Sequence, residues 1–93
     1  GTKDSKLYYK GRIVKANPSL KYQVFSVPNE NGTGSTNYVV APSGKIASNA
    51  RVKDADKVEY KTNSSGVLVA IDGDTNIKGT FETPQEPEWT NND

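Results

Sequence analysis

The 93-residue chain contains no cysteine, no histidine and no methionine. The absence of cysteine excludes disulfides, thiolate nucleophiles and thiolate metal ligands. The absence of histidine excludes imidazole ligands and the side chain that most often transfers protons near neutral pH. Most enzyme classes thereby lose their key residue, so we expect a non-enzymatic protein with no cofactor and no metal. No apolar run approaches the roughly 20 residues of a membrane-spanning helix, so no membrane span is expected.

Hydrophobic residues are also scarce, at 32% of the chain. A chain of this length forms one domain and buries only a modest share of its surface. The core is therefore expected to be thin or spread along an elongated body. Small secreted domains of animals usually stabilise weak cores with disulfides, so a cysteine-free module is expected to be a bacterial surface protein or a cytosolic one. The composition favours the surface mildly.

The net charge is only +1, but the charges are distributed unevenly. Early residues are mostly basic, and late residues are mostly acidic: Lys3, Lys6, Lys10, Arg12, Lys15 and Lys21, then Asp72, Asp74, Glu82, Glu86, Glu88 and Asp93. The basic residues near the start of the chain have two interpretations. They could form a patch that binds a polyanion such as nucleic acid or wall teichoic acid, or they could lie on ordinary solvated strands. Surface charge usually serves solubility, so we favour the second.

Short β-favouring runs recur along the chain between turn signals, and no window has a helical period. The predicted strands are 6–9, 12–16, 22–27, 38–41, 45–47, 58–61 and 67–71. The separators supply positive φ or a preset turn: Lys10-Gly11, residues 28–36, Pro42-Ser43-Gly44, residues 63–66 and Asp72-Gly73. The sequence therefore predicts an all-β fold of successive antiparallel hairpins.

The predicted domain organisation has three parts. Residues 1–5 are expected to be a disordered N-terminus and residues 6–81 a β-hairpin repeat domain. Residues 82–93 contain two prolines and several carboxylates, a composition that cannot bury enough surface to order itself. We expect them to form an acidic tail or linker.

An internal repeat has an offset of 22 residues. It aligns YVVAPSGKIAS, from Tyr38, with YKTNSSGVLVA, from Tyr60, so that Gly44 matches Gly66 and Ile46 matches Leu68. A shorter echo has Tyr8 and Tyr9 before the turn at Gly11. Repeats of this length usually form stacked supersecondary units that share a core. The two matched glycines are expected to be turn residues with positive φ.

This order of strand tyrosine, serine-glycine turn and apolar second strand resembles the cell-wall-binding repeats of choline-binding and glucan-binding surface proteins, which also occur in clostridial toxin tails. The resemblance covers residues 38–73 well and residues 7–37 loosely. It implies β-hairpins stacked as a short solenoid-like module, with aromatic side chains at the junctions holding choline or sugar. The family's glycine-tryptophan pair is replaced by Asn49-Ala50 and by Ile71-Asp72.

The resemblance implies an extracellular or cell-surface module of a Gram-positive bacterium that binds cell-wall polysaccharide or teichoic acid weakly. The ligand-binding residues it implies are Tyr38, Tyr60, Tyr8, Tyr9 and Tyr22. Nucleic acid is not an expected partner, and self-association is left open. The alternative is a structural spacer or protein-protein interaction module in which every tyrosine belongs to the core.

Two groups of carboxylates also suggest sites, and we interpret both as polar turns. Asp72 and Asp74 begin like a calcium loop, but Ile77 stands where an EF-hand requires glycine. Asp54, Asp56 and Glu59 lie close in sequence, yet glycoside hydrolysis needs two carboxyl groups across a deep cleft. A thin stack of hairpins offers no such cleft.

Overall fold

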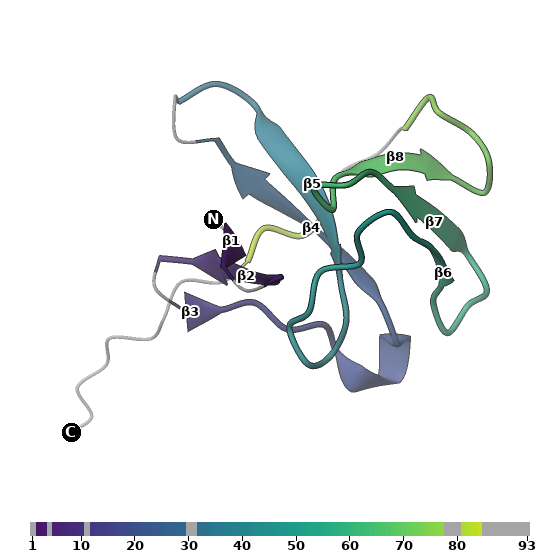
Figure 1. Cartoon of the computed structure of the whole chain (residues 1–93), viewed down its shortest axis with the longest axis horizontal. Helices are drawn as coiled ribbons and strands as arrows, with labels where there is room; N and C mark the ends of the chain where they lie inside the picture. The colour runs from purple at the N-terminus through teal and green to yellow at the C-terminus, as the bar shows by residue number, and fades with distance from the viewer. Residues whose placement is uncertain (1, 4, 11, 30–31, 78–80, 85–93) are drawn as a thin grey trace.

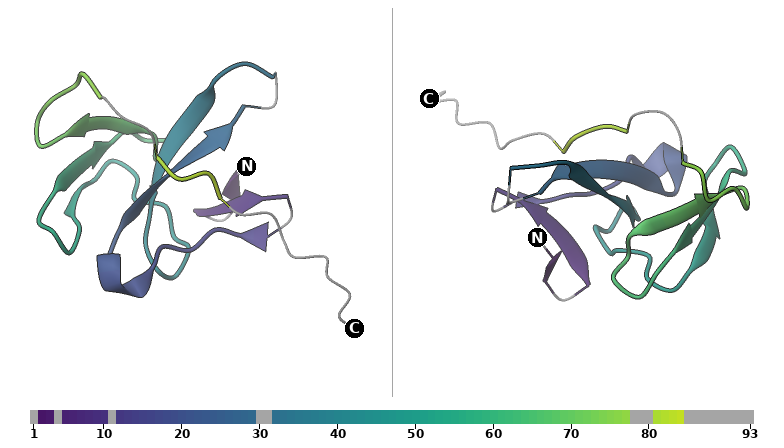
Figure 2. Two further views of the ribbon diagram at one scale, coloured as in Figure 1. Left: turned by 180° about the vertical axis from the view of Figure 1, so that it is seen from behind. Right: turned by 90° about the horizontal axis from the view of Figure 1, so that it is seen from above.

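The computed structural model describes residues 2–3, 5–10, 12–29, 32–77 and 81–84. It has three small antiparallel sheets in chain order, so the predicted all-β class is confirmed. The stacking of the hairpins as a solenoid-like module stays a prediction. The strands are β1 (Thr2–Lys3), β2 (Lys6–Tyr9) and β3 (Arg12–Ile13), then β4 (Gln23–Pro28) and β5 (Ser35–Val40), then β6 (Arg51–Lys53), β7 (Glu59–Thr62) and β8 (Leu68–Ile71). The β4–β5 hairpin lies between the other two sheets (Figures 1 and 2).

Some element boundaries differ from those expected from sequence. The 12–16 run is a ladder strand only at Arg12–Ile13, and the 45–47 run makes only isolated bridges, from Lys45 to Lys6 and from Ile46 to Val40. Strand β6 and the 3₁₀ turn η1 (Pro18–Leu20) were not predicted. Both are too short for a periodic signal, and β6 is established by its pairing with β7.

The two ends of the chain also differ from the predicted organisation. Thr2–Lys3, placed in a disordered terminus by the sequence, pair with β2. Glu82, placed at the start of the tail, bridges Phe25 in parallel and accepts the N–H of Ser26 through its carbonyl at 2.9 Å. The rest of the predicted tail, residues 85–93, lies outside the described residues.

The two aligned repeat segments have the same turn. Between 41 and 45, Ala41 N–H donates to the Lys45 carbonyl at 2.9 Å and Gly44 N–H to the Ala41 carbonyl at 2.9 Å. The equivalent bonds, Asn63 N–H to Val67 carbonyl and Gly66 N–H to Asn63 carbonyl, measure 3.0 and 2.9 Å. This is a type I turn followed by a left-handed residue, and φ is +92° at Gly44 and +83° at Gly66. The predicted turn role of both glycines is confirmed.

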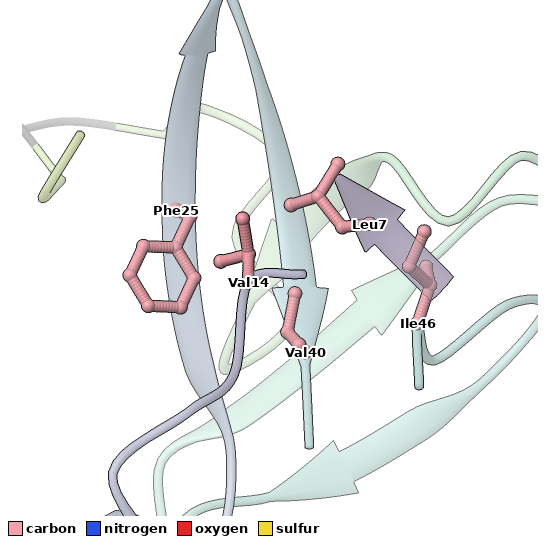
Figure 3. Packing of buried hydrophobic residues seen from close by; sticks show 5 residues of the cluster. All are labelled: Leu7, Val14, Phe25, Val40 and Ile46. Atoms are coloured by element: carbon pink, nitrogen blue, oxygen red, sulfur yellow. The ribbon is translucent and has the colours of Figure 1, made fainter. Parts of the chain in front are cut away.

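Among the described residues, the core consists of two clusters, one on each side of the β4–β5 hairpin. The first cluster contains Leu7, Val14, Phe25, Val40 and Ile46, which come from β2, β4, β5 and two extended segments (Figure 3). The second cluster contains Val24, Val39 and Leu68. Successive residues of one strand point to opposite faces. The alternation of Val24 with Phe25 and of Val39 with Val40 therefore lets one hairpin supply both clusters.

Isoleucines of one hairpin cover the turn glycines of the next. A Cβ placed on Gly44 would lie 2.6 Å from Ile13 Cδ1, and one placed on Gly66 would lie 2.1 Å from Ile46 Cγ2. Both glycines therefore have a second role, since they admit a neighbouring side chain where any other residue would collide with it.

Candidate functional site

The five tyrosines implied as ligand-binding residues are all half-buried. Tyr9 and Tyr38 pack against the first cluster, whereas Tyr22 and Tyr60 pack against the second. Tyr8 lies on β2 opposite Ile13. Tyr38 and Tyr60 hold matching positions in the repeat, but they pack against different clusters, and neither lines the two grooves described below. That they bind ligand stays a prediction.

Tyr60 has a specific polar partner in Asp54. Its hydroxyl donates to Asp54 Oδ2 at 2.8 Å. Burial raises the pKa of Tyr60 to about 12, with further contributions from the bond to Asp54 and from neighbouring carboxylates. Burial also opposes ionisation of Asp54, but the bonds from Tyr60 and from the N–H groups of Val58 and Asp56 outweigh it, so the pKa of Asp54 is lowered. Asp54 therefore holds the β6–β7 turn together.

Stability should depend on this tyrosine at alkaline pH. Because the pKa of Tyr60 is about 12 when folded and near 10 when unfolded, its contribution is complete below about pH 10 and is lost as pH rises through the folded value. We expect Tyr60→Phe to lose less stability than the parent between these pH values, as measured by urea unfolding at several alkaline pH values. Equal losses in both proteins would contradict the assignment.

A large groove runs between the segment 12–18 and the edge of β4. Its volume is about 670 Å³, and Gln23, Phe25, Glu82 and Pro84 line its other side. Val14, Ala16, Phe25 and Pro84 are buried, whereas the side chains of Arg12, Lys15, Asn17 and Glu82 are exposed. This large groove thus has an apolar base with polar and charged groups along its rim.

Hydrogen bonds hold the rim of the large groove in place. Gln23 Nε2 donates to Glu82 Oε1 at 2.9 Å, and Gln23 Oε1 accepts the N–H of Asn17 at 3.0 Å. Asn17 Oδ1 in turn accepts the N–H of Ser19 and caps η1. Pre-organised amides of this kind suit a ligand rich in hydroxyl groups, because less side-chain entropy is lost on binding.

A smaller groove of about 210 Å³ lies at the start of the β6–β7 pair, where Arg51 and Lys61 face each other across the strands. Its remaining lining comes from Asn49, Ala50 and Thr62. Neither groove contains a carboxylate pair, and Glu82 is the only acidic residue among their lining residues.

The carboxylates considered as metal or catalytic candidates act within turns. Asp72 Oδ1 accepts the N–H of Glu59 at 2.9 Å, and Asp74 Oδ1 accepts the N–H of Asn76 at 2.9 Å. Asp72 and Gly73 both have positive φ, as a two-residue hairpin turn requires. Within the described residues, no three acidic side chains gather where they could hold a metal ion.

Comparison with protein-family models, with curated proteins and with solved structures found no match. Among the described residues, no helix has the length and apolar character needed to cross a membrane.

Sequence reasoning missed both grooves because their walls come from distant segments. The large groove combines residues 12–18 with Gln23 and with Glu82, and the bond from Gln23 to Glu82 joins residues 59 positions apart. The strand alternation around Gln23 predicts which face it occupies. Nothing local indicates that Glu82 lies beside it.

Proposed function

We propose that the chain is a non-enzymatic bacterial surface module that binds cell-wall glycan or polymer weakly. The observation that supports this most is the large groove, an open trough of about 670 Å³ with an apolar base and a hydrogen-bonding rim. Its cations, Arg12 and Lys15, and its amides, Asn17 and Gln23, suit hydroxyl groups and anions on an extended polymer. Phe25 and Pro84 lie beneath them and are mostly buried.

Binding at one such groove is expected to be weak. The apolar base is mostly covered, so little surface is left for a sugar to bury, and each exposed polar contact adds only about 0.5–1.5 kcal/mol. Affinity for a wall would come from repetition of the ligand along a polymer, which raises the effective concentration for the next contact. Monosaccharides are accordingly expected to bind barely at all.

Sedimentation with purified Gram-positive cell walls tests the proposal. We expect the parent to be retained, and Arg12→Ser with Lys15→Ser to be retained about fivefold less, the equivalent of losing roughly 1 kcal/mol of contacts. Lys21→Asn with Lys57→Asn is the matched control, because it removes the same charge elsewhere and asparagine tolerates the positive φ of both sites. Equal loss in both variants would show a general charge effect and contradict the groove.

A second pair of substitutions tests the tyrosines. Tyr38→Leu with Tyr60→Leu keeps apolar packing against both clusters but removes the aromatic faces on which a sugar stacks. If this folded variant loses retention on walls while Arg12→Ser with Lys15→Ser keeps it, the ligand lies on the tyrosines.

The second candidate function is a structural spacer or interaction module. The packing of Tyr38 and Tyr60 against separate clusters favours it, because half-buried rings in a core serve stability. Complete absence of parent retention on walls would support the spacer.

A further inference from the structure

The outward face of the β6–β7 pair carries an unfavourable charge arrangement. Arg51 lies directly opposite Lys61, and both side chains are exposed. Like charges in this position destabilise a sheet. One pair further along, Lys53 lies opposite Glu59, a complementary arrangement. Neither Arg51 nor Lys61 has an ion-pair partner among the residues that the structure describes.

A buried threonine lies beside these two cations in sequence but on the inward face of the sheet. Thr62 is 4% exposed and lines the small groove together with Arg51 and Lys61. Its Oγ1 accepts the N–H of Ala50 at 3.1 Å. Because Thr62 follows Lys61 on β7, its side chain lies on the inward face of the sheet, on the same side as Tyr60. The outward side of the small groove thus offers two positive charges, Arg51 and Lys61.

We propose that the small groove binds a phosphate group of an anionic cell-wall polymer of the teichoic-acid type. The Arg51 guanidinium would bind phosphate oxygens through its planar fork, and Lys61 would act as a second positive charge. A bound phosphate would also relieve the repulsion between Arg51 and Lys61. This assignment rests on the proposed function and specifies its ligand as a phosphate polymer.

The position of the aromatic residues favours a polymer without nucleobases. Single-stranded nucleic acid is usually held by aromatic rings on which bases stack, beside cations that contact phosphates. On this sheet Tyr60 and its neighbour Val52 alternate with the cations and pack against the second cluster, on the other face. The outward face around the small groove therefore supplies charge without a stacking ring.

Titration with purified poly(glycerol phosphate) teichoic acid, followed by thermal unfolding, tests this proposal. The polymer should raise the melting temperature of the parent, since a ligand that binds only the folded state stabilises it. Arg51→Thr with Lys61→Thr should abolish the rise, while the charge-matched control Lys21→Asn with Lys57→Asn should keep it. In Arg51→Thr with Lys61→Thr, the slope of log affinity against log salt concentration should fall in magnitude by about 1 to 2.

Unliganded stability provides a control on folding. Removing the opposed cations should leave the melting temperature of Arg51→Thr with Lys61→Thr at or above that of the parent at low salt. If the double variant does not fold, the single substitution Lys61→Thr is tested in its place. It removes one charge, and it should lower affinity for the polymer and reduce the salt slope by about 1.

The outcomes distinguish this proposal from the proposed function. Arg51→Thr with Lys61→Thr could be retained on intact walls as well as the parent, with the same salt slope. That result would overturn the phosphate site and leave wall binding intact. Binding to purified polymer that depends on Arg51 and Lys61, without retention on walls, supports the phosphate site and overturns wall binding. Equally tight binding of single-stranded DNA of matched charge overturns the assignment to a polymer without bases.

Discussion

Gly66→Val is expected to abolish folding or to lower the melting temperature by tens of degrees. Gly66 has a φ of +83°, and a Cβ there would lie 2.1 Å from Ile46 Cγ2. The left-handed conformation costs an L-residue about 1–2 kcal/mol, and forcing atoms into a packed site costs a further 1–3 kcal/mol or so. For a domain of this size, each kcal/mol lowers the melting temperature by about 4–8 °C.

Gly73→Val is the matched control for the collision. Gly73 has almost the same φ, +82°, but a Cβ there would have no neighbour within 4 Å. This variant should therefore lose only the conformational part, about 1–2 kcal/mol. Thermal unfolding by circular dichroism measures both proteins. If the two variants lose equal stability, Ile46 does not pack over the Gly66 turn, and the contact between successive hairpins is absent.

Leu7→Ala is expected to have the second largest effect, a loss of about 3–4 kcal/mol in the free energy of unfolding. Leu7 is 0% exposed and belongs to the first cluster, where it packs with residues of β4 and β5 (Figure 3). Truncation removes apolar burial and leaves a cavity that a thin core cannot refill. The Leu7 carbonyl also accepts the N–H of Val14 at 2.8 Å. This backbone bond does not involve the side chain, so the substitution leaves it in place.

Val27→Ala serves as the comparison in the same cluster. Val27 packs against the cluster but is only half-buried, so its truncation should cost about 1 kcal/mol or less. Urea unfolding of both variants gives the difference. A loss for Leu7→Ala no larger than that for Val27→Ala would mean that the first sheet contributes little to the common core.

The turns show what local sequence can predict. Gly44, Gly66 and Asp72-Gly73 were expected to supply positive φ, and all four residues do so. The match between the two repeat segments also extends to their turn hydrogen bonds. These features depend on steric limits within a few residues, which do not change with the rest of the fold.

Strand extent was less predictable, for a physical reason. The 12–16 run has the composition of a strand, yet residues beyond Ile13 lack a continuous ladder partner on the described chain and instead line the large groove. Strand β6 is only three residues long and depends on β7 for its pairing. Whether a β-favouring segment forms a strand therefore depends on a neighbour that local sequence does not specify.

The sequence by itself excluded thiol and imidazole chemistry, because the chain has no cysteine and no histidine. It also determined the all-β class and the hairpin turns, because composition and φ preferences are local properties. Only the tertiary structure decided that Tyr38 and Tyr60 pack against different clusters, that Glu82 meets Gln23, and that Arg51 faces Lys61. Each of these depends on strand register or on contacts between distant segments. A shift of register by one residue would reverse every face, and no short window of sequence records that choice.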